Sequence, residues 1–333
     1  MNSYGTKFRL SIFGESHGDC IGVVIDGVPA GIPLTTEDFV PDLARRKSGS
    51  KGTTPRLEED LPKILSGVYQ ECTTGAPIAI TFENKNVNSN DYSKFRETPR
   101  PGHADFVSSV KHNYFNDLRG GGHFSGRLTL TLVAAGVIAK KMLENINIQA
   151  KITHIGGIAD TLKSDNSLPD SWQTALSNAI AENDSLGGII ECTCTNVPIA
   201  IGDPFFNSLE SQISHLIFSI PGVRGIEFGD GFKASSMKGS QHNDCYINSE
   251  GKTKKNGSGG INGGLSNGNP IVFRVAIKPT SSIGKSQNSY NFITEQMEEI
   301  KISGRHDACI ALRCPVIIEA VVAIVLADNL INQ

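Results

Sequence analysis

Arginine is concentrated in one stretch of the sequence, and this concentration is the first indication of chemistry. Seven of the twelve arginines fall between positions 45 and 127, and most of them border glycine, proline or serine. These seven are Arg45, Arg46, Arg56, Arg96, Arg100, Arg119 and Arg127. Taken singly, each has roughly even odds of being a solvated surface residue. As a set, with Arg305 in Gly-Arg-His-Asp, they predict an anion site, because the planar guanidinium grips carboxylate or phosphate with two parallel hydrogen bonds.

Three histidines occur in polar, turn-like contexts and could move protons in such a site. His17 lies in Gly-Glu-Ser-His-Gly, His103 lies in Arg-Pro-Gly-His-Ala-Asp, and His306 precedes Asp307. A histidine near its ordinary pKa is a natural general acid at neutral pH, and a nearby carboxylate tunes it. A lone loop histidine is more often simply polar surface. We do not interpret the His17 motif as the nucleophile elbow of hydrolases, because the serine precedes the histidine and no strand-to-helix turn is apparent there, so a hydrolase is disfavoured.

Glycine is the third candidate for binding chemistry. The chain has 35 glycines, above the ~7% average usage, and they cluster in runs such as 120–122 and 259–264. Such runs let backbone N–H groups approach a phosphate or a flat cofactor ring, although for each run alone a tight turn between strands is the better interpretation. Neither run has the spacing of a Rossmann or P-loop motif, so a nucleotide-binding fold is not supported.

Composition excludes several classes of function. Hydrophobic residues make up 38% of the chain and the formal net charge is -3, so it folds but has no global positive field for nucleic acid or an anionic membrane. Seven cysteines without a C-x-x-C pair indicate reduced thiols, and no secretory pattern opens the chain. The apolar stretch 315–327 is shorter than the roughly 20 residues of a membrane span. We therefore expect a cytoplasmic protein with no metal, nucleic-acid or membrane partner.

The elements that must position these residues are readable from hydrophobic periodicity. A short helix is expected to end at residues 45–47, and His17 falls on the turn between two strands. We predict strands over 8–13, 21–25, 64–68, 77–83, 188–194 and 271–277, and buried helices over 130–146 and 315–330. Two buried helices among antiparallel strands predict an α+β fold in which sheets enclose helices. We treat residues 1–333 as a single domain.

Several motifs, in order, resemble the chorismate synthase family over nearly the whole chain, from residue 8 to residue 328. They are Gly-Glu-Ser-His-Gly, Arg-Pro-Gly-His-Ala-Asp, Arg-Gly-Gly-Gly with Ser-Gly-Arg, Glu-Phe-Gly-Asp-Gly-Phe, Lys-Pro-Thr-Ser-Ser and Gly-Arg-His-Asp. The resemblance implies a β-α-β sandwich, helices between two antiparallel sheets. It also implies a carbon–oxygen lyase of the shikimate pathway of aromatic amino acid biosynthesis, which eliminates phosphate from 5-enolpyruvylshikimate 3-phosphate in a trans-1,4 sense to give chorismate.

The resemblance further implies a cofactor, partners and residue roles. The cofactor is reduced FMN, used without net redox change and supplied by an external flavin reductase or another source; the family is also associated with NADP and is typically a homotetramer. His17 would be the acid near the departing phosphate, and His103 would donate a proton to the flavin. Asp307 would assist removal of the ring proton. The substrate anions would be gripped by Arg46, Arg56, Arg100, Arg127 and Arg305.

The flavin would lie on backbone and hydroxyl groups, with a few charged side chains. The positions that the resemblance assigns to flavin binding are Arg46, Lys51, His123, Phe124, Ser125, Pro221, Gly222, Gly263, Lys278, Pro279, Thr280, Ser281, Ser282 and Arg305. Two positions depart from the family pattern, since His123 and Lys51 stand where arginine is frequent.

Two other classes of function remain open from the residues alone. A flavin-binding or anion-binding module without turnover would keep the glycine-rich and Lys-Pro-Thr-Ser-Ser segments but would not need the histidines and Asp307 together. An RNA-binding protein could use the basic segments 45–56 and 252–255, but the aromatic content of 7% and the missing RNP-like motif argue against it.

Overall fold

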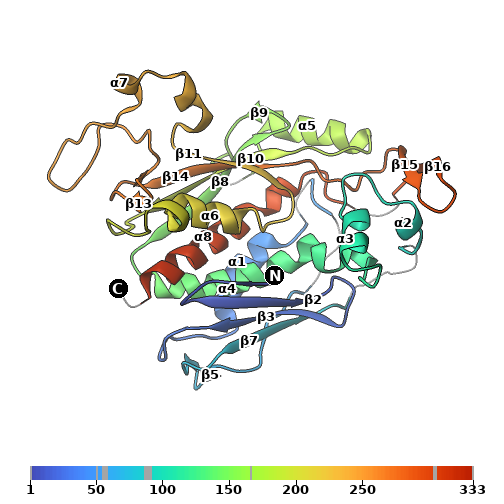
Figure 1. The fold of residues 1–333 in the computed structure, drawn as a ribbon, viewed down its shortest axis with the longest axis horizontal. Coiled ribbons are helices and arrows are strands. Elements are labelled where there is room, and N and C mark those ends of the chain that lie inside the picture. Colours follow the sequence, from blue (N-terminus) through green and yellow to red (C-terminus); the bar gives the residue numbers. More distant parts are fainter. Residues whose placement is uncertain are drawn as a thin grey trace.

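The fold is a sandwich of two antiparallel sheets around a layer of helices. The computed structural model describes residues 2–49, 52–54, 59–85, 92–165, 167–302 and 306–331. Within these ranges each main sheet has five strands, and the two longest helices lie between the sheets (Figure 1). The predicted α+β sandwich is confirmed.

The first sheet is built from the N-terminal part of the chain. Its order is β1-β2-β3-β7-β4, with β1 at Ser3–Tyr4, β2 at Arg9–Gly14, β3 at Cys20–Asp26, β4 at Lys63–Ile64 and β7 at Ile78–Glu83. The register pairs Ile21 with Phe82 and Val23 with Ile80, and all four side chains are fully buried. This period-two pattern places one face of the sheet against the helices.

The second sheet covers the opposite side of the helices. Its order is β11-β14-β10-β8-β9, with β8 at Asn147–Ile155, β9 at Ile158–Ala159, β10 at Gly188–Thr195, β11 at Val223–Phe228 and β14 at Ile271–Ile277. Burial alternates strictly along β10 and β14, so each strand presents every second side chain to the core.

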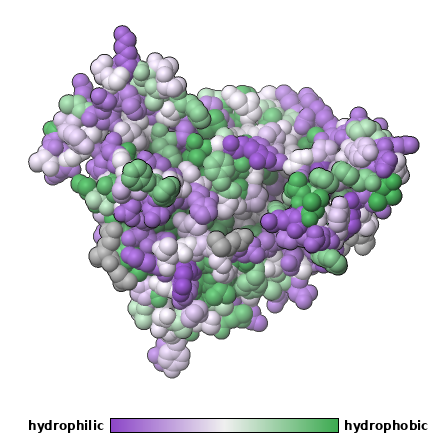
Figure 2. Space-filling model, in the orientation of Figure 1, coloured by the Kyte–Doolittle hydropathy of each residue, from purple (hydrophilic) through white to green (hydrophobic). Residues whose placement is uncertain are grey.

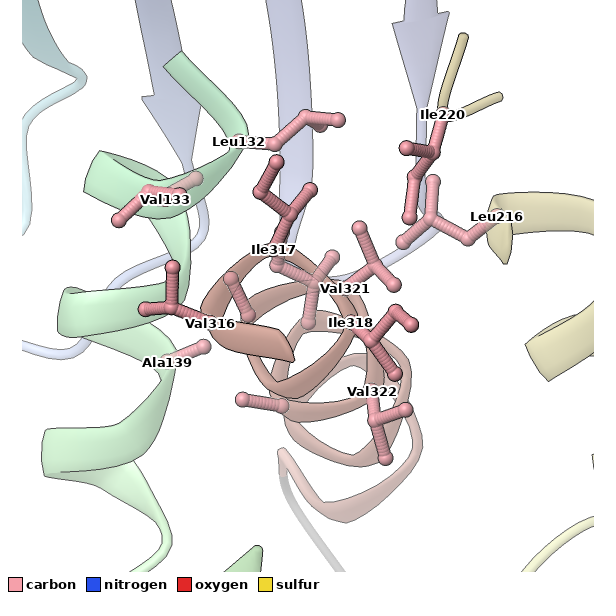
Figure 3. Packing of buried hydrophobic residues seen from close by; sticks show 14 of the residues in the cluster. Leu132, Val133, Ala139, Leu216, Ile220, Val316, Ile317, Ile318, Val321 and Val322 are labelled. Atoms are coloured by element: carbon pink, nitrogen blue, oxygen red, sulfur yellow. The ribbon is translucent and has the colours of Figure 1, made fainter. Parts of the chain in front are cut away.

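The helix layer forms the centre of the core. It contains α4 (Thr129–Met142) and α8 (Pro315–Leu330), with α1 (Val40–Arg46) and α6 (Leu209–Ile217) beside them. Figure 3 shows α8 end-on, with Val316 turned towards α4 and Val322 on the side of α6. Nearly every residue of α4 and α8 is buried, as expected for helices that are apolar on all sides. Among the described residues, no helix is long and apolar enough to cross a bilayer.

Smaller elements surround this sandwich. The remaining helices are α2 (Lys94–Glu97), α3 (Asp105–Lys111), α5 (Asp170–Ala181) and α7 (Gly239–His242). The remaining strands form hairpins from β5 (Val68–Tyr69) and β6 (Cys72–Thr73), β12 (Ile261–Asn262) and β13 (Leu265–Ser266), and β15 (Gln287–Asn291) and β16 (Gln296–Ile300). Short 3₁₀ segments occur at Glu37–Phe39, Arg119–Phe124, Gly126–Leu128, Phe205–Asn207, Gly231–Ser236 and Ile310–Arg313.

Two elements are shorter in the structure than the sequence predicted. The strand expected over 64–68 is interrupted, because Gly67 has a φ of +80° that takes the chain out of the sheet, and only Lys63–Ile64 pairs with β7. The helix expected over 130–146 ends at Met142, and the chain turns there to enter β8 at Asn147.

The two ends of the described chain are joined by a buried carboxylate. Asp328, near the end of α8, accepts hydrogen bonds from the backbone N–H groups of Thr6, Lys7 and Phe8 at 3.0, 2.6 and 2.8 Å. Backbone donors of this kind are costly to bury unpaired, so the contact fixes the start of β2 against the last turn of α8.

Helices α4 and α8 approach each other closely at Gly136. A Cβ at this position would lie 2.3 Å from the Cβ of Ala320 and 2.5 Å from its Cα. We expect Gly136→Ala to lower the free energy of unfolding by about 1–3 kcal/mol, since overpacking outweighs the roughly 1 kcal/mol gain in helix propensity. Thermal unfolding followed by circular dichroism measures the change.

The matched control is Gly239→Ala in α7, where a new Cβ would meet nothing within 4 Å. That variant should unfold at the parent temperature or slightly above it. Equal midpoints for the two variants would contradict the close helix contact.

Candidate active site

A cavity of about 1140 Å³ is lined by residues of the helix layer and of the segment that carries α3. Figure 2 shows a hollow on one face of the molecule with hydrophilic residues beside it. Its volume exceeds the roughly 300–1,000 Å³ of an ordinary single-ligand pocket, so it has room for two small molecules. The predicted site residues on its wall are His17, Arg46, Arg100, His103, His123, Phe124, Ser125, Arg127, Pro221, Gly222, Lys278, Thr280, Ser281, Ser282 and Asp307.

Not every predicted residue is brought to the cavity. Gly263 lies in the tight turn between β12 and β13, and neither it nor Pro279 is among the described lining residues. Lys51, Arg56 and Arg305 lie outside the described residues. Their predicted roles stay predictions.

His17 is held in the turn between β2 and β3, as predicted. The ring is 6% exposed and packs edge-on against Tyr92, with ring centroids 5.4 Å apart. On another side it lies against Gly120, where an added Cβ would be 2.5 Å from both Cδ2 and Nε2 of the imidazole. A glycine at 120 is therefore required for the ring to occupy this place on the cavity wall.

The glycine run itself is a backbone turn that only glycine adopts readily. Gly120, Gly121 and Gly122 have φ values of +59°, +84° and +55°. A Cβ on Gly122 would be 1.9 Å from the carbonyl oxygen of Asp117. The sequence allowed a tight turn or a ligand-binding backbone at this run. The run forms a tight turn, and Gly120 and Gly121 also line the cavity.

His103 is fixed at both ring nitrogens. Nδ1 lies 3.0 Å from the carbonyl oxygen of Pro101, which only accepts, so Nδ1 carries the proton and donates it. Nε2 then accepts from the hydroxyl of Ser282, 2.7 Å away. Burial, followed by the nearby Arg100 guanidinium, lowers the pKa of His103 to about 4. The ring is therefore neutral at physiological pH, the state in which Nε2 can accept from Ser282.

Arg46 and Arg127 come from different parts of the chain and share one carboxylate. Asp60 lies 3.5 Å from Nη1 of Arg46 and 3.0 Å from Nη1 of Arg127. Arg46 also donates from Nε to the hydroxyl of Thr129, while Nε of Arg127 donates to the side-chain oxygen of Asn84. Arg46 is 3% exposed, and its burial, with the neighbouring Arg313 as second cause, lowers its pKa to about 9.

Asp307 and Arg313 lie beside Arg46 and Arg127, and the three arginines form what we call the cationic wall of the cavity. Asp307 accepts a hydrogen bond from the backbone N–H of Thr54 at 2.7 Å and lies 3.2 Å from Nη1 of Arg313. Nε of Arg313 donates to the carbonyl oxygen of Arg46 at 2.8 Å. Three guanidinium groups, those of Arg46, Arg127 and Arg313, thus share two carboxylates.

Arg100 is placed on the cavity wall but is already paired. Its Nε and Nη2 donate to the two carboxylate oxygens of Asp105 at 2.7 and 2.8 Å, and both residues are buried. Its guanidinium carbon lies 4.6 Å from the ring centre of Phe95, a cation–π contact. Because its donors are used in this pairing, Arg100 has less capacity to bind a ligand than Arg46 or Arg127. The charge of Arg100 also lowers the pKa of His103.

The walls also carry groups suited to a flat, phosphorylated cofactor. His123 donates from Nδ1 to the carbonyl oxygen of Gly14 at 2.8 Å, which fixes its ring. The hydroxyl of Thr280 is buried and has no hydrogen-bond partner within the described chain. A buried hydroxyl without a partner is costly, so a ligand that satisfies it gains affinity. No cluster of metal-ligating side chains occurs among the residues that the structure describes.

Sequence reasoning missed three residues of the wall. Asp60, Arg224 and Arg313 were not singled out, although all three line the cavity. Asp60 has no motif around it, and its role depends on two arginines that come from elsewhere in the chain. Arg313 follows Asp307 by six residues, just before α8, and that proximity was the available signal.

Comparisons with known proteins agree with this geometry. A family model described as chorismate synthase matches residues 8–331. A chorismate synthase from Chitinophaga pinensis is 58% identical and covers 100% of this chain and 97% of the relative, and one from Dehalococcoides mccartyi is 45% identical over 98% and 96%. A crystal structure of a chorismate synthase superimposes with a TM-score of 0.75 at 28% identity, covering 98% of this chain and 92% of that chain.

The neutral state of His103 is open to direct measurement. In ¹⁵N-histidine NMR, with the resonance assigned through His103→Gln, we expect a titration midpoint near pH 4 and no change between pH 6 and 8. Because the folded pKa lies below the unfolded value of about 6.5, the site contributes stability above that pH and loses it as the pH falls towards 4. A midpoint near 6.5 would contradict the geometry.

Proposed function

Because the chain belongs to the chorismate synthase family, we propose that the cavity is its active site and that the converging arginines and histidines bind and turn over 5-enolpyruvylshikimate 3-phosphate there. The chain is accordingly a carbon–oxygen lyase of the shikimate pathway. It eliminates phosphate from this substrate to give chorismate, with a flavin as cofactor. The assignment of individual residues to this reaction is our proposal.

The observation that carries the proposal is the excess of positive charge in one buried wall. Arg46, Arg127 and Arg313 share Asp60 and Asp307, so one guanidinium charge remains without a carboxylate among the residues described. Holding like charges together away from water is unfavourable unless an anion completes the set. A substrate with two carboxylates and one phosphate supplies such an anion.

His17 is suited to the role of acid beside the departing phosphate. Its ring is nearly buried, fixed by Tyr92 and Gly120, and directly follows Ser16 on the cavity wall. A developing phosphate dianion nearby favours the protonated ring, so a proton or hydrogen bond from His17 stabilises the leaving group.

The residues present fit a flavin. The unpartnered hydroxyl of Thr280, the open backbone at Gly121 and the side chains of Lys278 and Ser125 all face one cavity with room for two ligands. When bound, reduced FMN would donate electron density transiently to help expel phosphate, with no net redox change. The chain's own groups then have to hold the ring and substrate in contact and exclude water from them.

His103 and Asp307 would handle the remaining protons. His103 is neutral before ligands bind, but an anion near Nε2 raises its pKa, so the ring takes up a proton as the site fills. Asp307 is aimed by the Thr54 backbone N–H and by Arg313, which holds its carboxylate ready to assist removal of the ring proton.

Four further features rest on the family resemblance. We propose that the flavin is FMN in its reduced form, that an external reductase or another source supplies it, that the protein assembles as a homotetramer, and that it works in the cytoplasm. The seven cysteines form no disulfide in the structure, which supports a reducing compartment.

Turnover is the first test. Purified protein with substrate and reduced FMN, without oxygen, should release phosphate and form chorismate. We expect His17→Asn to lower kcat by about 10²–10⁴-fold, the usual worth of general acid catalysis, with flavin affinity within about twofold of the parent.

The matched control for His17 is His215→Asn in α6, whose ring packs on Tyr4 away from the cavity. It should retain parental turnover. Absence of phosphate release by the parent would favour a flavin-binding protein without turnover, and a His17 variant within about tenfold of the parent would remove His17 from proton transfer.

Substrate binding tests the cationic wall. Arg127→Lys keeps the charge near Asp60 but loses the planar fork, so the substrate dissociation constant should rise by the equivalent of roughly 1.5–3 kcal/mol. Isothermal titration calorimetry measures it, with Arg9→Lys, an exposed arginine paired with Asp26, as control. An unchanged isotherm would show that Arg127 does not touch the substrate.

A further inference from the structure

Tyr92 lies where two parts of the cavity wall meet. It stands just before α2, and its carbonyl oxygen accepts a hydrogen bond from the backbone N–H of Phe95 at 3.1 Å. The side chain is half-buried and lines the cavity, and its ring centroid lies 5.4 Å from that of His17. Tyr92 is therefore the neighbour of the proposed acid on the α2 side of the cavity.

The contact between the two rings favours one orientation of the imidazole. The planes of His17 and Tyr92 are inclined at 86°, the perpendicular arrangement that aromatic rings prefer at this separation. Gly120 limits the imidazole as well, because its backbone lies against Cδ2 and Nε2. A general acid has to point at the atom that it protonates, so the orientation of this ring bears directly on the rate.

Tyr92 is in turn held by a buried ion pair. The guanidinium carbon of Arg100 lies 5.6 Å from the ring centre of Tyr92 and 4.6 Å from that of Phe95. The carboxylate of Asp105 fixes Arg100, because it accepts hydrogen bonds from Nε, Nη2 and the backbone N–H at 2.7, 2.8 and 3.1 Å. The Tyr92 and Phe95 rings also contact each other, with centroids 5.8 Å apart. The tyrosine that touches His17 thus has a rigid support behind it.

The ring of Tyr92, and not its hydroxyl group, makes these contacts. Within the part of the chain that the structure describes, the side chain meets His17, Phe95 and Arg100 through its ring, and the hydroxyl makes no hydrogen bond. Phenylalanine keeps the same ring and can stack on a cation in the same way, whereas leucine can do neither. Substitution can therefore separate a role of the ring from a role of the hydroxyl.

We propose that Tyr92 is a positioning residue, which holds the imidazole of His17 in the orientation in which it donates to the departing phosphate. The inference rests on the proposed function, because it takes His17 as the acid. Arg100 and Asp105 support the tyrosine one step further from the reaction. Tyr92 itself transfers no proton.

The first test compares turnover of single variants with substrate and reduced FMN, without oxygen. Tyr92→Leu removes the ring and should lower kcat by about 10–10²-fold, as expected when a reacting group is misplaced by about 1 Å, with KM for the substrate within about twofold of the parent. Tyr92→Phe keeps the ring and should retain kcat within about twofold. The matched control is Tyr69→Leu, an exposed tyrosine of β5 outside the cavity, which should behave like the parent.

A double-mutant cycle shows whether the tyrosine acts through His17. In a His17→Asn background, Tyr92→Leu should change kcat by no more than about twofold, because no imidazole is left to orient. A tyrosine that only stabilised the fold would lower kcat by the same factor in both backgrounds. Circular dichroism checks the folding of every variant, and Tyr92→Met, which fills the space without a planar ring, repeats the cycle should the leucine variant unfold.

The outcomes separate the inference from the proposed function. If the parent turns over and Tyr92→Leu keeps kcat within about twofold, the inference is wrong and the proposed function stands. Equal losses in both backgrounds, or a loss in Tyr92→Phe as large as in Tyr92→Leu, would also overturn the positioning role, since the first points to the fold and the second to the hydroxyl. A rise in KM with unchanged kcat would make Tyr92 a substrate contact instead. If the parent releases no phosphate, the proposed function fails and the inference fails with it.

Discussion

The structure depends on burying two largely apolar helices side by side. Helices α4 and α8 have no polar face, so both must be covered on all sides, and the two five-stranded sheets provide that cover. The close contact between Gly136 and Ala320 fixes how the helices pack. Once they are packed in this way, both begin at the same end of the sandwich, next to the cavity (Figure 1).

Because α4 and α8 both begin next to the cavity, positive electrostatic potential is concentrated there. The N-terminal ends of α4 and α8 are the positive ends of two helix dipoles. The segments that lead into them supply Arg127 and Arg313, and α1 adds Arg46 from the side. A chain of net charge -3 thereby builds a local anion site, because the side chains of Arg46 and Arg127 are largely buried and the field acts over short distances.

Local patterns predicted most of the fold and part of the site. The helix expected over 315–330 and the strand over 271–277 match the structure at both ends, because an unbroken or strictly alternating apolar run is a purely local signal. Asp60 and Arg224 were missed because their roles come from tertiary contact: one is a counter-ion shared by arginines from other segments, the other lines the cavity as the extra residue of a β-bulge where β11 pairs with β14. The pairing of Arg100 with Asp105, five residues on, was equally invisible, since sequence does not say which charges neutralise each other.

Arg45 and Arg46 show why residue type alone does not identify a site. Consecutive positions on a helix point about 100° apart, so the two side chains leave α1 in different directions. Arg45 makes two hydrogen bonds, 2.6 and 2.8 Å long, to Glu319, the buried carboxylate of α8, which also accepts from the backbone N–H of Ala150. Glu319 is buried and also contacts Nζ of Lys140 at 3.2 Å, so Arg45 is one of two cations at this carboxylate and ties α1 to α8. That anchor is what allows the next residue, Arg46, to hold its charge rigidly against the cavity instead of in water.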